Sequence, residues 1–305
     1  MGCGGSKPVD PTEKPAAEKP AAAPAAAPAA AAPAAAAPAA AEKPAAAPAA
    51  APAAAPAAAA PTAAPAAAPA AAEPGPGPFG FSSGLPDCCT ASPDLYKTIA
   101  EIEGVGRLVE MIFPPGAADV PHEHPEHNMY FVTDVKLKIS GAPTPTKMGE
   151  EGAVVEVPAG AAPLFPAMAH QVTNVGEAEG KAVFFEAYPN CKPCGDIEGY
   201  ISPFDVSSDC YEKLNDDSEN FVTGLLKMEV GAKDAFHHHR DHLIYVLEGD
   251  GVTIYPGGDE SAGMAVPLKP FAGIPAPMAA PPFASHVLEN TGTIPLKLLF
   301  FEAKK

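Results

Sequence analysis

The chain has 305 residues, 40 prolines, no tryptophan and a formal net charge of −18. Most of the acidic residues lie after residue 78, and so acidic a folded region argues against a nucleic-acid partner, because phosphate backbones bind surfaces of the opposite charge. No stretch of 18 apolar residues is free of proline, so the sequence predicts no membrane-spanning helix.

The first seven residues, MGCGGSK, fit a lipid-anchor signal. Gly2 follows the initiator Met, and Ser6 stands where a myristoyl transferase reads its substrate. Cys3 can take a palmitoyl chain, and two acyl chains hold a protein at a membrane that one chain binds only marginally. We therefore expect anchoring through Gly2 and Cys3 at the cytoplasmic face of a membrane. The alternative is a free tail on a cytoplasmic protein.

Residues 8–78 consist almost entirely of alanine and proline. Proline recurs every three to five residues, so no alanine run is long enough to nucleate a helix before the next proline removes a backbone donor. The sequence therefore predicts that residues 1–78 form an acylation signal followed by a disordered, extended spacer. The folded region begins at residue 79.

The folded region contains one sequence twice, at an offset of 115 residues. The segment DLYKTI from Asp94 aligns with DCYEKL from Asp209, and HEHPEHNMYFV aligns with HHHRDHLIYVL. After a one-residue insertion, the FFEA of residues 184–187 aligns with the FFEA of residues 300–303. We therefore predict two similar domains, residues 79–190 and residues 191–305.

Each copy reads as short apolar runs separated by turn-forming residues, and helical periodicity is nearly absent. This pattern predicts an all-β fold with a small sandwich or barrel in each copy. The expected strands are residues 107–113, 129–139, 153–157 and 181–188 in the first copy and residues 221–230, 243–247, 251–255 and 296–303 in the second.

Histidines cluster at matching positions of the two copies. Along a strand, side chains alternate, so His237 and His239 share a face while His238 points to the other; Glu123 replaces His238 in the first copy. We therefore expect His238 to be exposed and not to bind metal. The third histidine of each cluster follows a short turn, and the fourth comes from a distant strand. The four histidines of each copy can therefore surround one ion. The predicted metal ligands are His122, His124, His127 and His170 in the first copy and His237, His239, His242 and His286 in the second.

These residues resemble the two motifs of the cupin superfamily. Gly116 stands six residues before the first histidine, and His170 is followed four residues later by Asn174. Gly231 and Asn290 take the same places in the second copy, so the folded region resembles a bicupin. The resemblance implies two tandem jelly-roll barrels of six strands, each holding a divalent metal. It does not imply one reaction.

The third ligand departs from the usual cupin pattern, in which it is a glutamate, because both copies have a histidine there: His127 and His242. Four neutral imidazoles leave the ion its full charge. Imidazole suits iron, nickel, copper and zinc, whereas manganese prefers oxygen ligands and is less favoured. We expect one divalent transition metal in each barrel.

Two classes of function agree with this sequence. The first, which we favour, is a metal-dependent enzyme of the oxygenase or lyase type that acts on a small oxygen-bearing molecule. The second is a non-catalytic protein, tethered to a membrane, that binds or senses a metal or a small ligand. No catalytic residue other than the metal ligands is evident.

Two further recurrences favour structural roles. Tyr130 and Tyr245 each follow the third histidine by three residues and are expected in the core rather than beside the metal. Cys191 and Cys194 form a C-x-x-C pair without a second pair, so we expect a disulfide in the linker or plain thiols.

Overall fold

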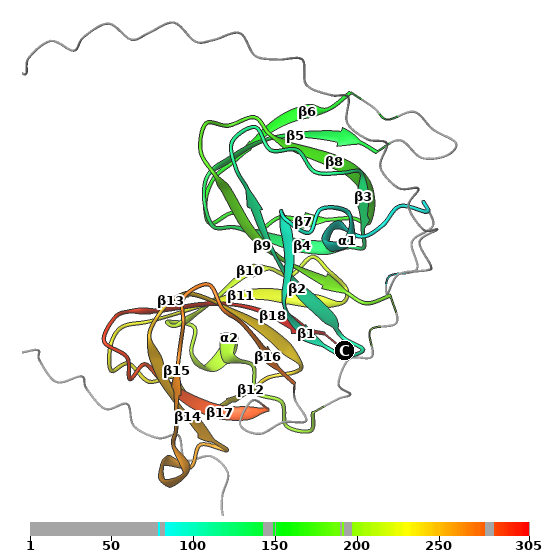
Figure 1. The fold of residues 1–305 in the computed structure, drawn as a ribbon. Coiled ribbons are helices and arrows are strands. Elements are labelled where there is room, and N and C mark those ends of the chain that lie inside the picture. Colours follow the sequence, from blue (N-terminus) through cyan, green and yellow to red (C-terminus); the bar gives the residue numbers. More distant parts are fainter. Residues whose placement is uncertain are drawn as a thin grey trace, which may run out of the picture. The chain divides into compact units, whose positions relative to one another are not determined.

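The structure is a computed structural model that describes residues 79, 83–142, 149, 151–189, 191, 197–277 and 284–304. These residues form two β-barrels, each built from one five-stranded and one four-stranded sheet (Figure 1). The expected all-β fold with two tandem barrels is confirmed. In the described part, no helix has the length and apolar character needed to cross a membrane.

Barrel 1 joins its strands in the orders β1-β2-β9-β4-β7 and β3-β8-β5-β6, with antiparallel pairs throughout. The two sheets face each other across the interior (Figure 1). The elements of barrel 1 are α1 (Cys88–Ala91), β1 (Tyr96–Ile102), β2 (Gly106–Phe113), β3 (His122–His124), β4 (His127–Phe131), β5 (Val135–Gly141), β6 (Ala153–Val157), β7 (Leu164–Phe165), β8 (Met168–Asn174) and β9 (Gly180–Ala187).

Barrel 2 repeats this topology strand for strand, in the orders β10-β11-β18-β13-β16 and β12-β17-β14-β15. The internal repeat of the sequence is therefore a repeat of structure. Its elements are α2 (Pro203–Val206), β10 (Tyr211–Asn215), β11 (Phe221–Met228), β12 (His237–His238), β13 (His242–Glu248), β14 (Gly251–Pro256), the 3-10 helix η1 (Glu260–Ala262), β15 (Met264–Pro267), β16 (Gly273–Ala276), β17 (Ser285–Glu289) and β18 (Leu296–Ala303).

The strand predictions need two corrections. The apolar run of residues 129–139 is two strands, β4 and β5, because Asp134 leaves the ladder and accepts a hydrogen bond from the Ala159 backbone N–H. Each barrel also has nine strands within the described residues instead of six. The additional strands include β3, β7 and β12, which are only two or three residues long and too short to show a periodic pattern. The expected boundaries at residues 78 and 190 fall outside the described residues.

The recurring glycine and asparagine of each copy have a structural role. Gly116 and Gly231 adopt φ values of 76° and 77°, a left-handed conformation that glycine adopts without a steric penalty. The Gly116 N–H donates to the Asn174 carbonyl, and the Asn174 side chain donates to the carbonyls of Phe113 and Ala178. Asn290 makes the same contacts in barrel 2. These residues therefore brace the turns that flank β8 and β17.

The two barrels share one hydrophobic cluster in addition to the apolar interior of each. The ring of Phe185 from β9 lies 4.9 Å from the ring of Phe221 and 5.8 Å from that of Phe301, both in barrel 2. The buried Thr223 hydroxyl also donates to the Asn128 side chain across the interface, at 2.7 Å. The barrels therefore pack against each other through this shared cluster.

Candidate metal centres

Three strands of barrel 1 bring its four histidines together. His122 and His124 lie at the two ends of β3 and share a face, as alternation predicts, and β3 pairs with β8 so that His122 is opposite His170. His127 begins β4 after a short turn. All four side chains are buried. The ring of His127 lies 4.6 Å from that of His124, centroid to centroid.

The Nε2 atoms of these rings face one another. His122 Nε2 lies 2.8 Å from His124 Nε2 and 3.1 Å from His170 Nε2. The ligand atoms of His122, His124 and His170 all lie within 4.8 Å of one another, close enough to hold one ion. The structure therefore brings together three of the predicted ligands and places the fourth, His127, beside them.

Hydrogen bonds on the opposite side of the rings set their protonation. His122 Nδ1 lies 2.8 Å from the Val120 carbonyl, and His127 Nδ1 lies 2.9 Å from the Pro125 carbonyl. A carbonyl oxygen can only accept, so each Nδ1 carries the proton and each neutral Nε2 keeps its lone pair. Such lone pairs repel each other unless a cation lies between them. The donor set therefore fits a divalent metal, with Nε2 atoms as its ligands.

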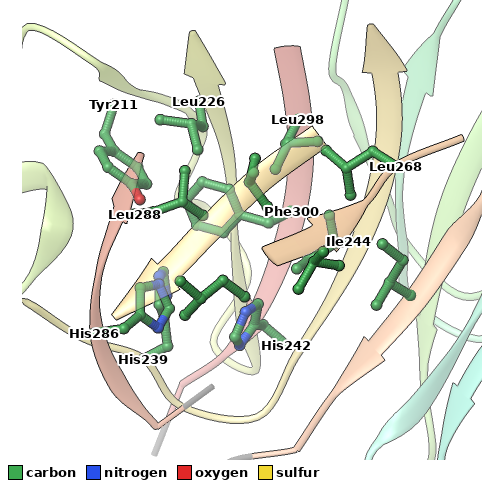
Figure 2. A pocket seen from close by; sticks show the side chains of 14 residues that line it. Tyr211, Leu226, His239, His242, Ile244, Leu268, His286, Leu288, Leu298 and Phe300 are labelled. Carbon is green, nitrogen blue, oxygen red and sulfur yellow. The ribbon is translucent and has the colours of Figure 1, made fainter. Parts of the chain in front are cut away.

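Barrel 2 repeats this arrangement. His237 Nε2 lies 2.9 Å from His239 Nε2, and β12 pairs with β17 so that His237 is opposite His286. The Nδ1 atoms of His237 and His242 donate to the carbonyls of Ala235 and Arg240 at 2.8 Å. Figure 2 shows His239, His242 and His286 together at one end of a pocket. The histidine pattern is thus the same in both copies.

Burial keeps these imidazoles neutral. It lowers the pKa of His124 and of His239 well below the usual value, and the neighbouring histidines lower both pKa values further. The pKa of His170 is lowered for the same reasons, burial first and His124 next. A neutral imidazole is the form that binds metal, so both clusters hold their nitrogens in the ligand state at neutral pH.

Sequence reasoning missed the two carboxylates that accept hydrogen bonds from Nδ1 of one histidine in each cluster. The Nδ1 atom of His124 donates to Glu186 at 2.6 Å, and that of His239 donates to Glu302 at 2.6 Å. Both glutamates are buried, and each is the third residue of an FFEA segment. The repetition of FFEA was the available signal. A carboxylate behind a ligating histidine fixes the ring and strengthens it as a ligand.

A tyrosine–aspartate pair stands beside the first histidine of each cluster. The Tyr96 hydroxyl donates to Asp119 at 2.8 Å, and the Tyr211 hydroxyl donates to Asp234 at 2.9 Å. The Tyr211 hydroxyl also lies 3.3 Å from His237 Nε2. Burial raises the pKa of each aspartate to about 6. Only the tyrosines lie in the repeated DLYKTI and DCYEKL segments, and sequence reasoning did not identify the aspartates.

A cavity adjoins each histidine cluster. The cavity of barrel 1 has a volume of about 400 Å³ and is bordered by His124, His127 and His170. The cavity of barrel 2 measures about 70 Å³ and is bordered by His239, His242 and His286. Apart from histidine and one tyrosine, the described residues that line either cavity are apolar.

The remaining predicted residues have mixed outcomes. His238 is half-buried rather than exposed, because its Nδ1 accepts a hydrogen bond from the Ile201 backbone N–H. Tyr130 and Tyr245 lie in the hydrophobic cluster shared by the barrels, which agrees with the expected core role. Gly2, Cys3 and Cys194 lie outside the described residues, so the acylation signal and the C-x-x-C pair stay predictions.

Comparison with known proteins gives similarity of fold at low sequence identity. No family model and no curated protein matches the chain. A cupin 2 conserved barrel domain protein from Leptotrichia buccalis shares 14% identity, with a TM-score of 0.41 over 69% of this chain and 88% of that one. An oxalate decarboxylase from Bacillus subtilis, described with Mn(II) centres, shares 15% identity, with a TM-score of 0.43 over 68% of this chain and 71% of that one.

A single cupin domain from Bordetella pertussis Tohama I shares 20% identity, with a TM-score of 0.27 over 30% of this chain and 91% of that domain. The fold itself is evident from the sheet orders and the registers, which are the same in both halves of the chain. With a buried histidine cluster at the same place in each half, the chain consists of two tandem β-barrels that are similar in fold to cupin domains.

Proposed function

We propose that each barrel binds one divalent transition metal and that the protein is a metal-dependent enzyme of the oxygenase or lyase type, acting on a small oxygen-bearing molecule. The observation that carries this proposal is that the Nε2 atoms of His122, His124 and His170 converge at the border of a cavity. The hydrogen bond of His122 Nδ1 keeps the proton on that nitrogen and leaves Nε2 free to bind the metal. The same arrangement recurs in barrel 2.

The ligand set limits the metal. Nδ1 of His127 and of His242 each donates to a backbone carbonyl, as in His122 and His237, and we propose that each completes a four-histidine site. Neutral imidazoles favour iron, nickel, copper or zinc over manganese. When bound, such an ion supplies Lewis acidity and open positions for an oxygen-bearing ligand.

The residues of the chain have distinct roles in this proposal. Glu186 and Glu302 hold the proton on Nδ1 of His124 and His239 and orient these rings. The Tyr96 hydroxyl borders the barrel 1 cavity and is oriented by Asp119, so it can accept a hydrogen bond from a bound ligand. The apolar walls keep bulk water away from that ligand.

Turnover by metal-loaded protein tests the enzymatic part of the proposal. Samples loaded with Fe(II), Ni(II), Cu(II) or Zn(II) are incubated with a set of small alcohols, ketones and hydroxy acids, and oxygen uptake and products are measured. We expect turnover with at least one metal and loss of turnover in His124→Ala. Metal binding without turnover of any of these compounds would favour the non-catalytic alternative, in which the barrels only bind a metal or a small ligand.

We also propose that the protein is anchored to the cytoplasmic face of a membrane by acyl chains on Gly2 and Cys3. The MGCGGSK start and the long Ala/Pro-rich segment after it support this proposal. An extended spacer would let an acidic folded region stand away from an anionic lipid surface that repels it. In either case, we propose a small molecule as the ligand of the barrels.

A further inference from the structure

The two cavities differ in what they can contain. The 70 Å³ of barrel 2 is well below the range of about 300–1,000 Å³ that is usual for small-molecule sites. The 400 Å³ of barrel 1 falls within that range. The histidine clusters are alike, so the difference arises from the walls.

Two matched positions of the two copies reduce the space in barrel 2, whereas Leu137 and Val252 differ in the opposite direction. Val172 in β8 and Leu288 in β17 occupy the same place, since each backbone N–H bonds the aspartate of its own tyrosine–aspartate pair. Ala182 and Leu298 also match, because they pair with Met111 and Leu226 in equivalent registers. Barrel 2 has the larger residue at both places. Figure 2 shows Leu288 and Leu298 among the side chains that line the pocket, with Leu298 at the end away from the histidines.

The lining of the barrel 1 cavity also restricts the chemistry of a ligand. Its described lining residues include no Lys, Arg, Asp or Glu, and its polar side chains are Tyr96 and the histidines at one end. Apolar walls stabilise a hydrocarbon by about 25 cal/mol for each Å² removed from water, whereas a charged group placed against them, beyond reach of the ion, loses its hydration without a partner. A small dianion such as oxalate would leave most of this cavity unfilled.

We propose that barrel 1 binds a neutral, mostly hydrocarbon molecule with one oxygen-bearing group directed at the histidine cluster, and that barrel 2 has too little space for such a molecule. This inference rests on the proposed function, because it assigns the substrate class of the same sites. It makes barrel 1 the substrate-binding half of the chain. Barrel 2 keeps an equivalent histidine cluster without space for an organic substrate.

Binding of 1-hexanol and of oxalate to the Zn(II)-loaded full chain tests this proposal, with affinity and stoichiometry measured by titration and NMR. We expect one 1-hexanol per chain and weaker binding of oxalate. Val172→Leu adds one methylene to the wall of barrel 1 and should weaken 1-hexanol binding at least about 4-fold. Leu298→Ala gives barrel 2 the alanine of barrel 1 and should create a second 1-hexanol site. Leu288→Val gives barrel 2 the valine of barrel 1, removes less volume and should have a smaller effect.

Tighter binding of oxalate than of 1-hexanol would overturn the proposed substrate class. A second result would also overturn it. In that result, Val172→Leu leaves 1-hexanol binding unchanged, whereas Leu298→Ala or Leu288→Val alters it. The metal content of each sample separates this result from the proposed function. A chain with two zinc ions that prefers oxalate refutes only the substrate class, whereas a chain that retains no metal refutes the proposed function, whatever it binds.

Discussion

His124 and Glu186 are joined by a hydrogen bond of 2.6 Å from the imidazole Nδ1 to the carboxylate, although 62 residues separate them in the chain. The bond turns the opposite nitrogen, Nε2, toward the other histidines of the cluster. His239 and Glu302 have the same relationship in barrel 2. The repeated FFEA segment therefore places a carboxylate behind the same histidine in both barrels.

Removing one of these carboxylates should weaken one metal site selectively. Glu302→Ala leaves the His239 ring without its acceptor, and loss of such a partner typically lowers metal affinity about 10- to 100-fold. Calorimetric titration of the metal-free protein should give this loss for one of the two sites. Glu248→Ala removes an exposed glutamate at the end of β13 and should change neither site. Equal effects of the two substitutions would contradict the role of Glu302.

Arg107 gives barrel 1 a feature that barrel 2 lacks. Its Nε donates to Glu186 at 2.7 Å and its Nη2 to Asp87 at 2.9 Å, and the side chain is buried, whereas the matching residue of barrel 2 is Val222. Arg107→Met leaves these carboxylates without a cation, so the free energy of unfolding should fall by about 3 kcal/mol in urea titrations.

Arg107→Met combined with Glu186→Gln removes both charges of the main pair and should recover part of that loss. If the double variant is less stable than Arg107→Met by the full cost of the single Glu186→Gln change, the two residues are energetically independent. The proposed ion pair would then contribute no coupling.

The buried histidines predict how stability depends on pH in the metal-free protein. Burial lowers the pKa of His124 and of His239 in the folded state, so below the ordinary value of about 6.5 the unfolded chain binds more protons than the folded one. The contribution of the histidines to the free energy of unfolding should therefore be constant above pH 7.5 and fall as the pH drops through 6.5.

Two aspartates, together with Glu186 and Glu302, whose pKa values burial also raises, oppose this trend at lower pH. Burial raises the pKa of Asp119 and of Asp234 to about 6, so below pH 6 the folded state takes up protons there and gains stability. The eight buried histidines outnumber these groups, and the net slope should stay positive with pH. Urea titrations of chelator-treated protein between pH 5 and 8 measure it. A stability that rises toward acid between pH 7 and 6 would contradict the buried neutral histidines.

The membrane anchor predicts a graded response to two substitutions. Gly2→Ala should release the protein to the soluble fraction, because no acyl chain can be attached first at Gly2. Cys3→Ser should give weak, partial membrane binding, as expected for one acyl chain. Both variants, expressed in a myristoylating host and fractionated, should keep the metal content of the parent. Wild-type protein found in the soluble fraction, or Gly2→Ala found with the membrane, would contradict the anchor.

Much of the fold and of the site could be predicted because the chain repeats itself. The offset of 115 residues paired His122 with His237, and strand alternation separated His238 from its neighbours, as in the structure. Glu186 and Glu302 also repeat, but a glutamate in a strand is usually at the surface, so its pattern alone did not point to a buried role.

Other features could not be predicted because they depend on contacts between residues that are far apart in the sequence. The difference in cavity volume arises from which side chains meet inside each barrel, and Val172 and Leu288 look like an ordinary conservative difference in the sequence. The division of residues 129–139 into β4 and β5 depends on a hydrogen bond from Ala159 to Asp134, 25 residues away. Such long-range contacts determine element boundaries that local patterns leave open.

The number of metal ions per chain tests the central claim most directly. Protein purified without oxygen, loaded with zinc and desalted should carry two ions, as measured by elemental analysis against protein concentration. His239→Ala should carry one and His124→Ala combined with His239→Ala none, whereas His238→Ala should keep two because its side chain lies on the other side of β12. The same metal content in His238→Ala and His239→Ala, or two ions retained by the double variant, would contradict the two four-histidine sites.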